Sequence, residues 1–125
     1  MCGIAGYVGP GLLDPTTIEE CLRLMRRRGP DSAAYSEHTP SPGRNVYLLN
    51  SRLKIIDLDD RANQPFRVRT KTLVYNGELY NYLELKEKLA GRGHEFTTAS
   101  DTEVLLKTID TFSWEGLDMC EGMWA

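Results

Sequence analysis

The chain begins MCGIAGYVG (residues 1–9), a run of small and apolar residues that predicts a buried strand loosened by its glycines. Cys2 would stand at the start of this strand. An initiator methionine is normally removed before a small second residue, and its removal would give Cys2 a free α-amine beside the thiol. Such an amine has an ordinary pKa of about 7.7–8.0, so it is partly neutral near pH 7. It can therefore serve as the general base for the thiol of its own residue.

Two other interpretations of Cys2 stay open from these residues alone. Cysteine at position 2 can be an ordinary small residue with no chemical role. With Met1 still attached, the α-amine is tied up in a peptide bond, and we expect that unprocessed form to be inactive.

Beyond this strand, capping residues and apolar spacing predict helices at about 16–28, 81–90 and 101–112. The first helix would begin either with Asp14 as N-cap and Pro15 at its first position, or with Thr16 as the cap. The other two helices each follow a capping box, Asn81 to Glu84 and Ser100 to Glu103. Gly29-Pro30 would end the first helix.

The remaining segments predict short strands. We expect at most one short strand near 33–36 in the polar segment 31–44, and further strands in the apolar runs 46–49 and 53–58. Residues 71–76 suggest another strand and a turn. Strands and helices are mixed along the chain, which favours the α+β class.

Composition describes an ordinary globular protein of 125 residues, with 41% hydrophobic and 26% charged residues and a net charge of −3. The mild acidity argues against nucleic acid or anionic lipid as partners, and no apolar run is long enough for a membrane span. Three cysteines do not make a disulfide framework, so we expect a cytoplasmic protein. Because the sequence stops at GMWA as an apolar run begins, we expect it to be a piece of a longer protein.

Asn76-Gly77 lies between two apolar runs and is first of all a hairpin-turn signal. The alternative is an oxyanion hole, because a side-chain amide next to an unencumbered backbone N–H offers two donors to a developing oxyanion. One turn can serve both purposes.

Three charged residues are candidates for binding a free amino acid. Arg52 is either a strand-end charge or a guanidinium fork for a carboxylate, and Glu78 and Asp101 are either surface acids or partners for an ammonium group. Together with an acyl-transfer centre they would suit a free amino acid with a side-chain amide. His38 and His94 have no partner at metal-ligand spacing, so we expect no metal site.

Seven motifs occur together in one order along the chain. The sequence resembles the class II, N-terminal-nucleophile glutamine amidotransferases, and within them the glutaminase domain of glutamine-hydrolysing asparagine synthetases. The segments that support this resemblance are MCGIAGYVG (1–9), RRGPD (27–31), SRLKIIDL (51–58), NQPF (63–66), YNGELYN (75–81), SDTEVLL (100–106) and EGMWA (121–125).

The resemblance implies a role for each matching position. Cys2 would be the nucleophile, and Asn76 and Gly77 would form the oxyanion hole. Arg52 would bind the α-carboxylate of glutamine. The ammonium group of the substrate would be bound by Glu78 and Asp101. The residues that would line the same pocket are Leu53, Lys54, Ile55 and Ile56.

The resemblance also implies a four-layer α/β/β/α sandwich, here incomplete at its C-terminus. Residues 1–125 would be the N-terminal part of the glutaminase domain, with the ATP-dependent synthetase domain absent. We expect no cofactor in this part, while ATP and magnesium are implied for the synthetase domain. The expected function is hydrolysis of L-glutamine to supply ammonia, with aspartate as the default acceptor. Two alternatives are another acceptor, such as a cell-surface sugar, and a non-catalytic glutamine-binding fragment.

Two segments depart from the family pattern. The family often has His-Arg-Arg-Leu where this chain has Asn50-Ser51-Arg52-Leu53, and Gly-His-Gln-Pro where it has Ala62-Asn63-Gln64-Pro65. Neither change replaces a proposed catalytic group.

Overall fold

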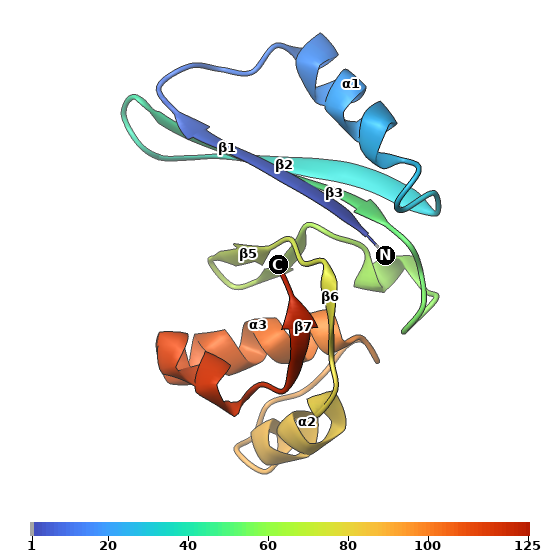
Figure 1. The fold of residues 1–125 in the computed structure, drawn as a ribbon. Helices are drawn as coiled ribbons and strands as arrows, with labels where there is room; N and C mark the ends of the chain where they lie inside the picture. The colour runs from blue at the N-terminus through green and yellow to red at the C-terminus, as the bar shows by residue number, and fades with distance from the viewer. Residues whose placement is uncertain (1) are drawn as a thin grey trace.

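The computed structural model describes residues 2–125, which form a mixed α/β structure (Figure 1). Two 3-10 helices, η1 (Asp60–Ala62) and η2 (Ser113–Met119), supplement the regular elements. The strands and α-helices, in chain order, are β1 (Gly3–Gly9), α1 (Pro15–Met25), β2 (Ser32–Ser41), β3 (Arg44–Arg52), β4 (Phe66–Val68), β5 (Lys71–Leu73), β6 (Gly77–Leu79), α2 (Tyr82–Ala90), α3 (Asp101–Phe112) and β7 (Gly122–Trp124).

The larger sheet has the antiparallel order β1-β3-β2, with Gly3 opposite Ser51 and Ser32 opposite Arg52. Helix α1 covers one face of this sheet, and Ile18 packs there against Tyr47 and Leu49 (Figure 1). The predicted strand 3–9 is confirmed. Because β3 is the central strand, its last residues lie beside both the start of β1 and the start of β2.

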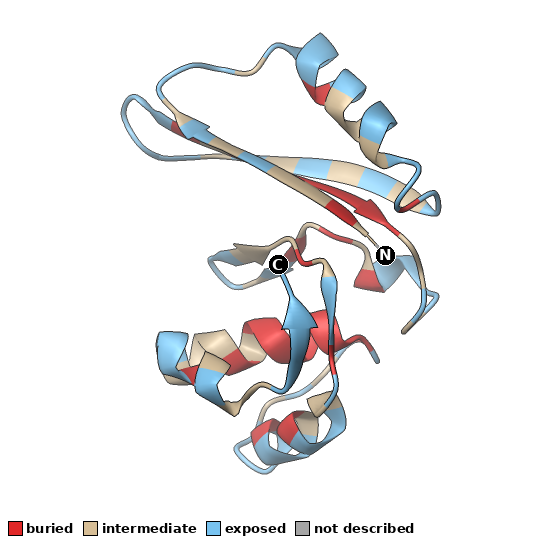
Figure 2. Cartoon of the chain, in the orientation of Figure 1, coloured by how far each residue is buried: buried red, intermediate tan, exposed pale blue. Residues whose placement is uncertain are grey.

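On the other side of the larger sheet lie two short antiparallel pairs, β4-β5 and β6-β7, with α3 and then α2 beyond them (Figure 1). Buried residues concentrate in the central strand and at the start of α3 (Figure 2). The second core joins the short strands to both helices, and its buried members are Tyr75, Leu79, Leu85, Leu89, Val104 and Leu105.

The helix predictions are confirmed within a few residues. Asp14 caps α1 by accepting the Thr16 N–H at 2.8 Å, with Pro15 at the first position. That helix ends at Met25 rather than near residue 28. Ser100 caps α3 and accepts the Thr102 N–H at 3.2 Å. In α2 the expected cap bond from Asn81 is missing, because that side chain binds the segment before β7 instead.

Two strand predictions and one turn prediction are wrong. The polar segment after residue 31 forms the ten-residue strand β2, which a polar sequence with Pro40 can do because β2 is an edge strand with one solvated face. Residues 53–58 form a loop instead of a strand. Asn76-Gly77 is not a hairpin turn: β6 pairs with β7, a segment more than forty residues later.

Within residues 2–125, none of the helices combines the length and apolar character that a membrane crossing requires.

Candidate active site

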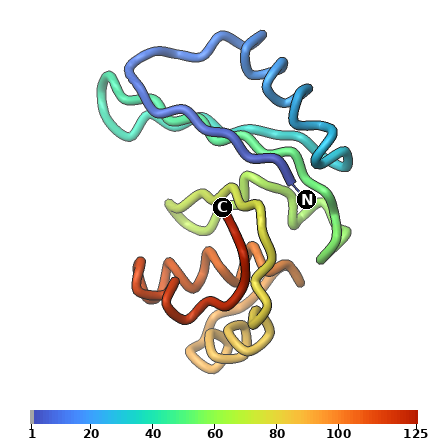
Figure 3. The backbone as a smooth tube through the Cα atoms, viewed as in Figure 1, coloured from blue at the N-terminus to red at the C-terminus, as the bar shows by residue number. Residues whose placement is uncertain are grey.

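A cavity of about 300 Å³ lies where the end of β3 meets β6, β7 and the start of α3. In the backbone trace, the end of β7 lies between α3 and the larger sheet, to which the start of β1 belongs (Figure 3). The sequence-predicted site residues that line this cavity are Cys2, Arg52, Leu53, Ile55, Ile56, Asn76, Gly77, Glu78 and Asp101. The structure thus brings together residues that are distant in the sequence.

Lys54 is the predicted residue that the structure places elsewhere. Its ammonium group pairs with the Asp60 carboxylate at 2.6 Å and does not line the cavity. Its backbone N–H donates to an Asp31 carboxylate oxygen at 2.8 Å.

Cys2 is half-buried at the entrance to β1. Its Sγ lies 3.8 Å from the Leu53 carbonyl oxygen, to which the thiol donates a weak hydrogen bond. Its own carbonyl accepts the Arg28 Nε–H at 2.9 Å. The thiol is therefore held against the loop that follows β3. The α-amine chemistry predicted for Cys2 depends on the removal of Met1, which lies outside the described residues.

The RRGPD segment packs against the end of β3, directly before this loop. Gly29 packs directly on the backbone of Ser51 and Arg52, where any Cβ would collide with the Ser51 carbonyl. The Ser51 hydroxyl donates to the Gly29 carbonyl at 2.6 Å. Only glycine permits this approach, so position 29 fixes where the end of β3 lies.

Arg52 is buried, with 4% of its surface exposed, and its guanidinium group organises the loop. Nη1 donates to the Asp59 carbonyl at 3.2 Å and to Asn63 Oδ1 at 2.9 Å. Nη2 donates to the Ile56 carbonyl at 3.0 Å and the Asp57 carbonyl at 2.6 Å. These bonds occupy the four hydrogens of the two terminal nitrogens, leaving the Nε–H and the positive charge for a ligand.

The Asn76-Gly77 pair lies at the junction of β6 and β7. Asn76 and Ala125 exchange both backbone hydrogen bonds, each 2.9 Å long, and Tyr80 donates to Glu121 at 2.7 Å. In an antiparallel ladder, bonded and non-bonded pairs alternate, so Gly77 opposite Trp124 is a non-bonded pair. The Gly77 N–H therefore points away from β7. Leu79, two residues on, points its N–H the same way and donates it to Asp101 Oδ2 at 3.2 Å.

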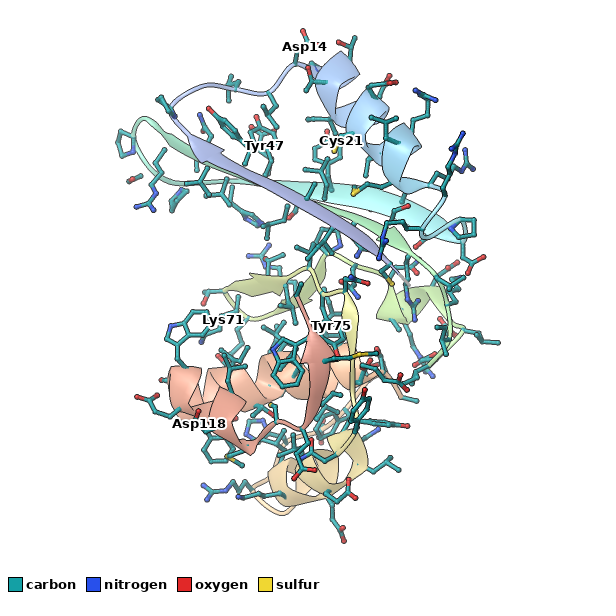
Figure 4. The ribbon with its side chains drawn as sticks, viewed as in Figure 1. Asp14, Cys21, Tyr47, Lys71, Tyr75 and Asp118 are labelled. Carbon is teal, nitrogen blue, oxygen red and sulfur yellow. The ribbon has the colours of Figure 1, made fainter. Side chains whose placement is uncertain are left out.

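Asp101 is buried in the first turn of α3, with 6% of its surface exposed, where the helix dipole favours its negative charge. Its Oδ2 accepts both the Leu79 N–H and the Tyr75 hydroxyl, each at 3.2 Å. Among the described residues, its Oδ1 accepts only a long bond of 3.4 Å, from the Ser100 hydroxyl. Burial and the neighbouring Asp101 charge raise the pKa of Tyr75 well above its usual value, so Tyr75 remains a donor. Figure 4 shows Tyr75 beside β6 and β7.

Glu78 supplies a second carboxylate to the same cavity. It is exposed, and its carboxylate has no hydrogen-bond or ion-pair partner within residues 2–125. Two acidic residues, Glu78 and Asp101, therefore line the same cavity as the buried Arg52.

Several lining residues were not predicted from the sequence. Gln64, Tyr75 and Thr102 lie at the inner wall, and the segment 123–125 forms a side of the cavity. Gln64 belongs to the NQPF motif, which was the one signal available for it. The segment 123–125 belongs to the EGMWA motif, but its place beside the cavity depends on the pairing of β7 with β6.

A glutamine amidotransferase domain is the class that this combination of fold and cavity defines. The family described as "Glutamine amidotransferase domain" matches residues 1–125, and the chain belongs to that family. Its curated relatives include asparagine synthetase [glutamine-hydrolyzing] 1 of Bacillus subtilis (strain 168), 37% identical, and asparagine synthetase [glutamine-hydrolyzing] of Zea mays, 39% identical. A putative asparagine synthetase [glutamine-hydrolyzing] 2 of Methanocaldococcus jannaschii is 32% identical.

All of this chain is covered in each of these three matches. It spans 20% of the Bacillus protein, 21% of the maize protein and 27% of the Methanocaldococcus protein.

Proposed function

We propose that this chain hydrolyses the side-chain amide of L-glutamine and supplies the ammonia to an asparagine-synthetase-like amide transfer, with aspartate as the acceptor. The observation that carries the proposal is one cavity that is lined by Cys2, by Gly77, whose N–H points away from β7, and by the acidic residues Glu78 and Asp101. A nucleophile, an oxyanion donor and ammonium-binding groups are what glutamine hydrolysis requires.

The reaction begins once Met1 has been removed and the Cys2 amine is free. The thiol gives its proton to this amine while Sγ attacks the side-chain carbonyl carbon of glutamine. The Asn76 amide and the Gly77 N–H stabilise the resulting oxyanion. The carbon–nitrogen bond then breaks, and the proton on the amine passes to the leaving nitrogen, which departs as ammonia. Water hydrolyses the remaining γ-glutamyl thioester to glutamate and restores the thiol.

The charged residues that line the cavity bind the two charged groups of the substrate. Asp101 Oδ1 and the Glu78 carboxylate bind the α-ammonium group, because Asp101 Oδ2 is already occupied by the chain. Arg52 attracts the α-carboxylate through its charge and its remaining Nε–H. Leu53, Ile55 and Ile56 form the adjoining lining of the cavity.

We also propose the larger setting of this domain. Helix α1, the larger sheet, the two short strand pairs and the pair α2–α3 correspond to the layers of an α/β/β/α sandwich that further strands complete. Residues 1–125 are then the N-terminal part of the glutaminase domain of a cytoplasmic enzyme. ATP and magnesium belong to its synthetase part, and no residue of this chain is assigned to them.

The test uses the full-length protein with Met1 removed. We expect ammonia release from L-glutamine, and asparagine formation when aspartate, ATP and magnesium are added. Cys2→Ser should abolish ammonia release, whereas Cys21→Ser, the same change in α1 and away from the cavity, should preserve it. Ammonia release that survives Cys2→Ser would refute the mechanism, and asparagine formation replaced by amidation of another acceptor would refute aspartate as the substrate.

A further inference from the structure

Gln64 joins three separate parts of the cavity wall through one buried side chain. It is 4% exposed and lies between β3, the segment before β6 and the start of α3. Its Oε1 accepts the Tyr75 N–H at 2.6 Å and the Asn50 Nδ2–H at 3.2 Å. Its Nε2 donates to the Thr102 hydroxyl at 3.3 Å. Neither its burial nor its three partners follow from the NQPF motif alone.

The orientation of this amide is determined by the backbone. A backbone N–H can only donate, so the atom that faces the Tyr75 N–H must be the Gln64 oxygen. The Gln64 nitrogen must then face Thr102, and Asn50 must present its own nitrogen to Gln64. This leaves Asn50 Oδ1 buried with no hydrogen-bond partner within residues 2–125. The chain thus retains the network although one of its acceptors is unsatisfied, which is unusual in a protein interior.

Two partners of Gln64 are each one residue away from a group that the proposed reaction uses, and the third, Asn50, lies on the strand that pairs with β1. Tyr75 precedes Asn76, and Thr102 follows Asp101. Asn50 precedes Ser51, which lies opposite Gly3, the residue after Cys2. One side chain therefore joins the oxyanion segment and the ammonium-binding helix to β3, the strand that pairs with β1 directly after Cys2.

We propose that Gln64 is a positioning residue that holds the Asn76-Gly77 donors at the distance from Cys2 that the tetrahedral intermediate requires. This inference rests on the proposed glutamine hydrolysis. A displacement of about 1 Å in a catalytic group can lower the rate about 10²-fold while substrate binding persists. Loss of the Tyr75 bond frees the backbone immediately before the oxyanion donors, which is where such a displacement would arise.

Gln64 also lines the cavity, so a direct contact with substrate is the competing interpretation. The two roles differ in what they do to kinetics. A residue that binds substrate equally in the ground state and the transition state changes KM, whereas one that positions the oxyanion donors changes kcat. An inhibitor that forms an oxyanion should distinguish them further.

The experiment compares Gln64→Met with the unmodified full-length enzyme, both with Met1 removed. Methionine keeps the length and volume of glutamine and removes all three hydrogen bonds. Steady-state glutaminase kinetics give kcat and KM. Inhibition is measured with L-glutamate and with L-glutamate γ-semialdehyde, whose aldehyde adds the Cys2 thiol to form a tetrahedral oxyanion without any leaving group.

A second pair of variants keeps the proposal testable if Gln64→Met does not fold. Thr102→Val removes one bond to Gln64, and Thr108→Val makes the same change further along α3. Within residues 2–125, the Thr108 hydroxyl bonds only to the Val104 carbonyl of its own helix, at 2.8 Å. Thr108→Val should leave kcat unchanged, and Thr102→Val should lower it by about tenfold.

The expected result for Gln64→Met is a loss of about 10²-fold in kcat and in affinity for the semialdehyde, with KM and glutamate affinity within about twofold of the unmodified enzyme. Unchanged kcat, or a loss confined to KM and glutamate affinity, would overturn the positioning role. If Gln64→Met does not fold, unchanged kcat in Thr102→Val would overturn it. An unmodified enzyme that releases no ammonia would instead refute the proposed function.

Discussion

Asp31 contacts the backbone on both sides of Leu53: its N–H donates to the Arg52 carbonyl at 3.0 Å, and its carboxylate accepts the Lys54 N–H at 2.8 Å. The Leu53 carbonyl between these two bonds is the acceptor for the Cys2 thiol. One aspartate in the RRGPD segment therefore sets the position of the group against which the proposed nucleophile rests.

Asp31→Ala should lower glutaminase kcat by about tenfold, because the loop that orients Cys2 loses its side-chain anchor while the charge of Arg52 stays in place. Ammonia release and thermal unfolding would be measured together in the full-length enzyme. Asp118→Ala is the matched control, since Asp118 is exposed and accepts no hydrogen bond within the described residues. Equal kcat in the two variants would contradict the role given to Asp31.

Gly77→Ala should disrupt the pairing of β6 with β7. A Cβ at position 77 would lie 2.6 Å from the Trp124 Cα and closer still to the Met123 carbonyl, both of them backbone atoms that cannot rotate away. We expect at least a 10²-fold loss of glutaminase activity, because the Gly77 N–H moves with the strand.

Gly91→Ala provides the comparison for this variant. Position 91 ends α2 at φ −61°, and an added Cβ would meet its nearest neighbours at an ordinary 3.6 Å. Activity and unfolding temperature should be unchanged there. A Gly77→Ala enzyme as active as Gly91→Ala would exclude the Gly77 N–H from the oxyanion hole.

Signals from neighbouring residues were sufficient to predict the helices, whereas pairing between distant segments determines where the strands form. The Asp14 and Ser100 caps are contained in a few neighbouring residues, so the sequence was sufficient to find them. Strand β2 is polar because it lies at an edge of the sheet, and only the order β1-β3-β2 reveals that. The loop 53–58 looks like a strand because it is rich in apolar residues, three of which, Leu53, Ile55 and Ile56, line the cavity instead of packing in a sheet.

The candidate site shows the same division. Cys2, Arg52, Asn76 and Asp101 could be named from their chemistry and the motifs around them, and the structure places all four around one cavity. Gln64 could not, because its partners are 11, 14 and 38 residues away in the sequence. A residue that acts by joining distant segments has no local signature.

Arg52→Lys should destabilise the loop that follows β3 and weaken the binding of glutamine. A lysine ammonium has three donors on one nitrogen and cannot satisfy the four acceptors that the two terminal guanidinium nitrogens reach. We expect a loss of about 2–3 kcal/mol in the free energy of unfolding, because partly buried oxygen acceptors lose their partners, together with a raised KM for glutamine. Urea unfolding and glutaminase kinetics would measure the two effects. A variant with unchanged stability would contradict the loop-organising role.

Glu103 should make the domain sensitive to acid. Its buried carboxylate accepts the Thr98 N–H and hydroxyl, both at 2.7 Å, and pairs with the Lys107 ammonium at 2.7 Å. Burial alone would raise the pKa of Glu103, but the Lys107 and Thr98 bonds outweigh it and hold that pKa below its usual value. Its stabilising effect is therefore complete above the ordinary glutamate pKa of about 4.3 and is lost as the pH falls through the lowered value.

Glu103→Gln should cost about 3 kcal/mol in the free energy of unfolding at pH 7, because the amide has one acceptor oxygen where the carboxylate has two and carries no charge to pair with the Lys107 ammonium. The difference from the unmodified protein should shrink as the pH is lowered below about 4, where the carboxylate becomes protonated. Urea unfolding between pH 3 and about 7 would follow this, with exposed Glu115→Gln as the control at each pH. A stability difference that stayed constant across that range would show that the Glu103 charge does not hold the Thr97–Thr98 segment on α3.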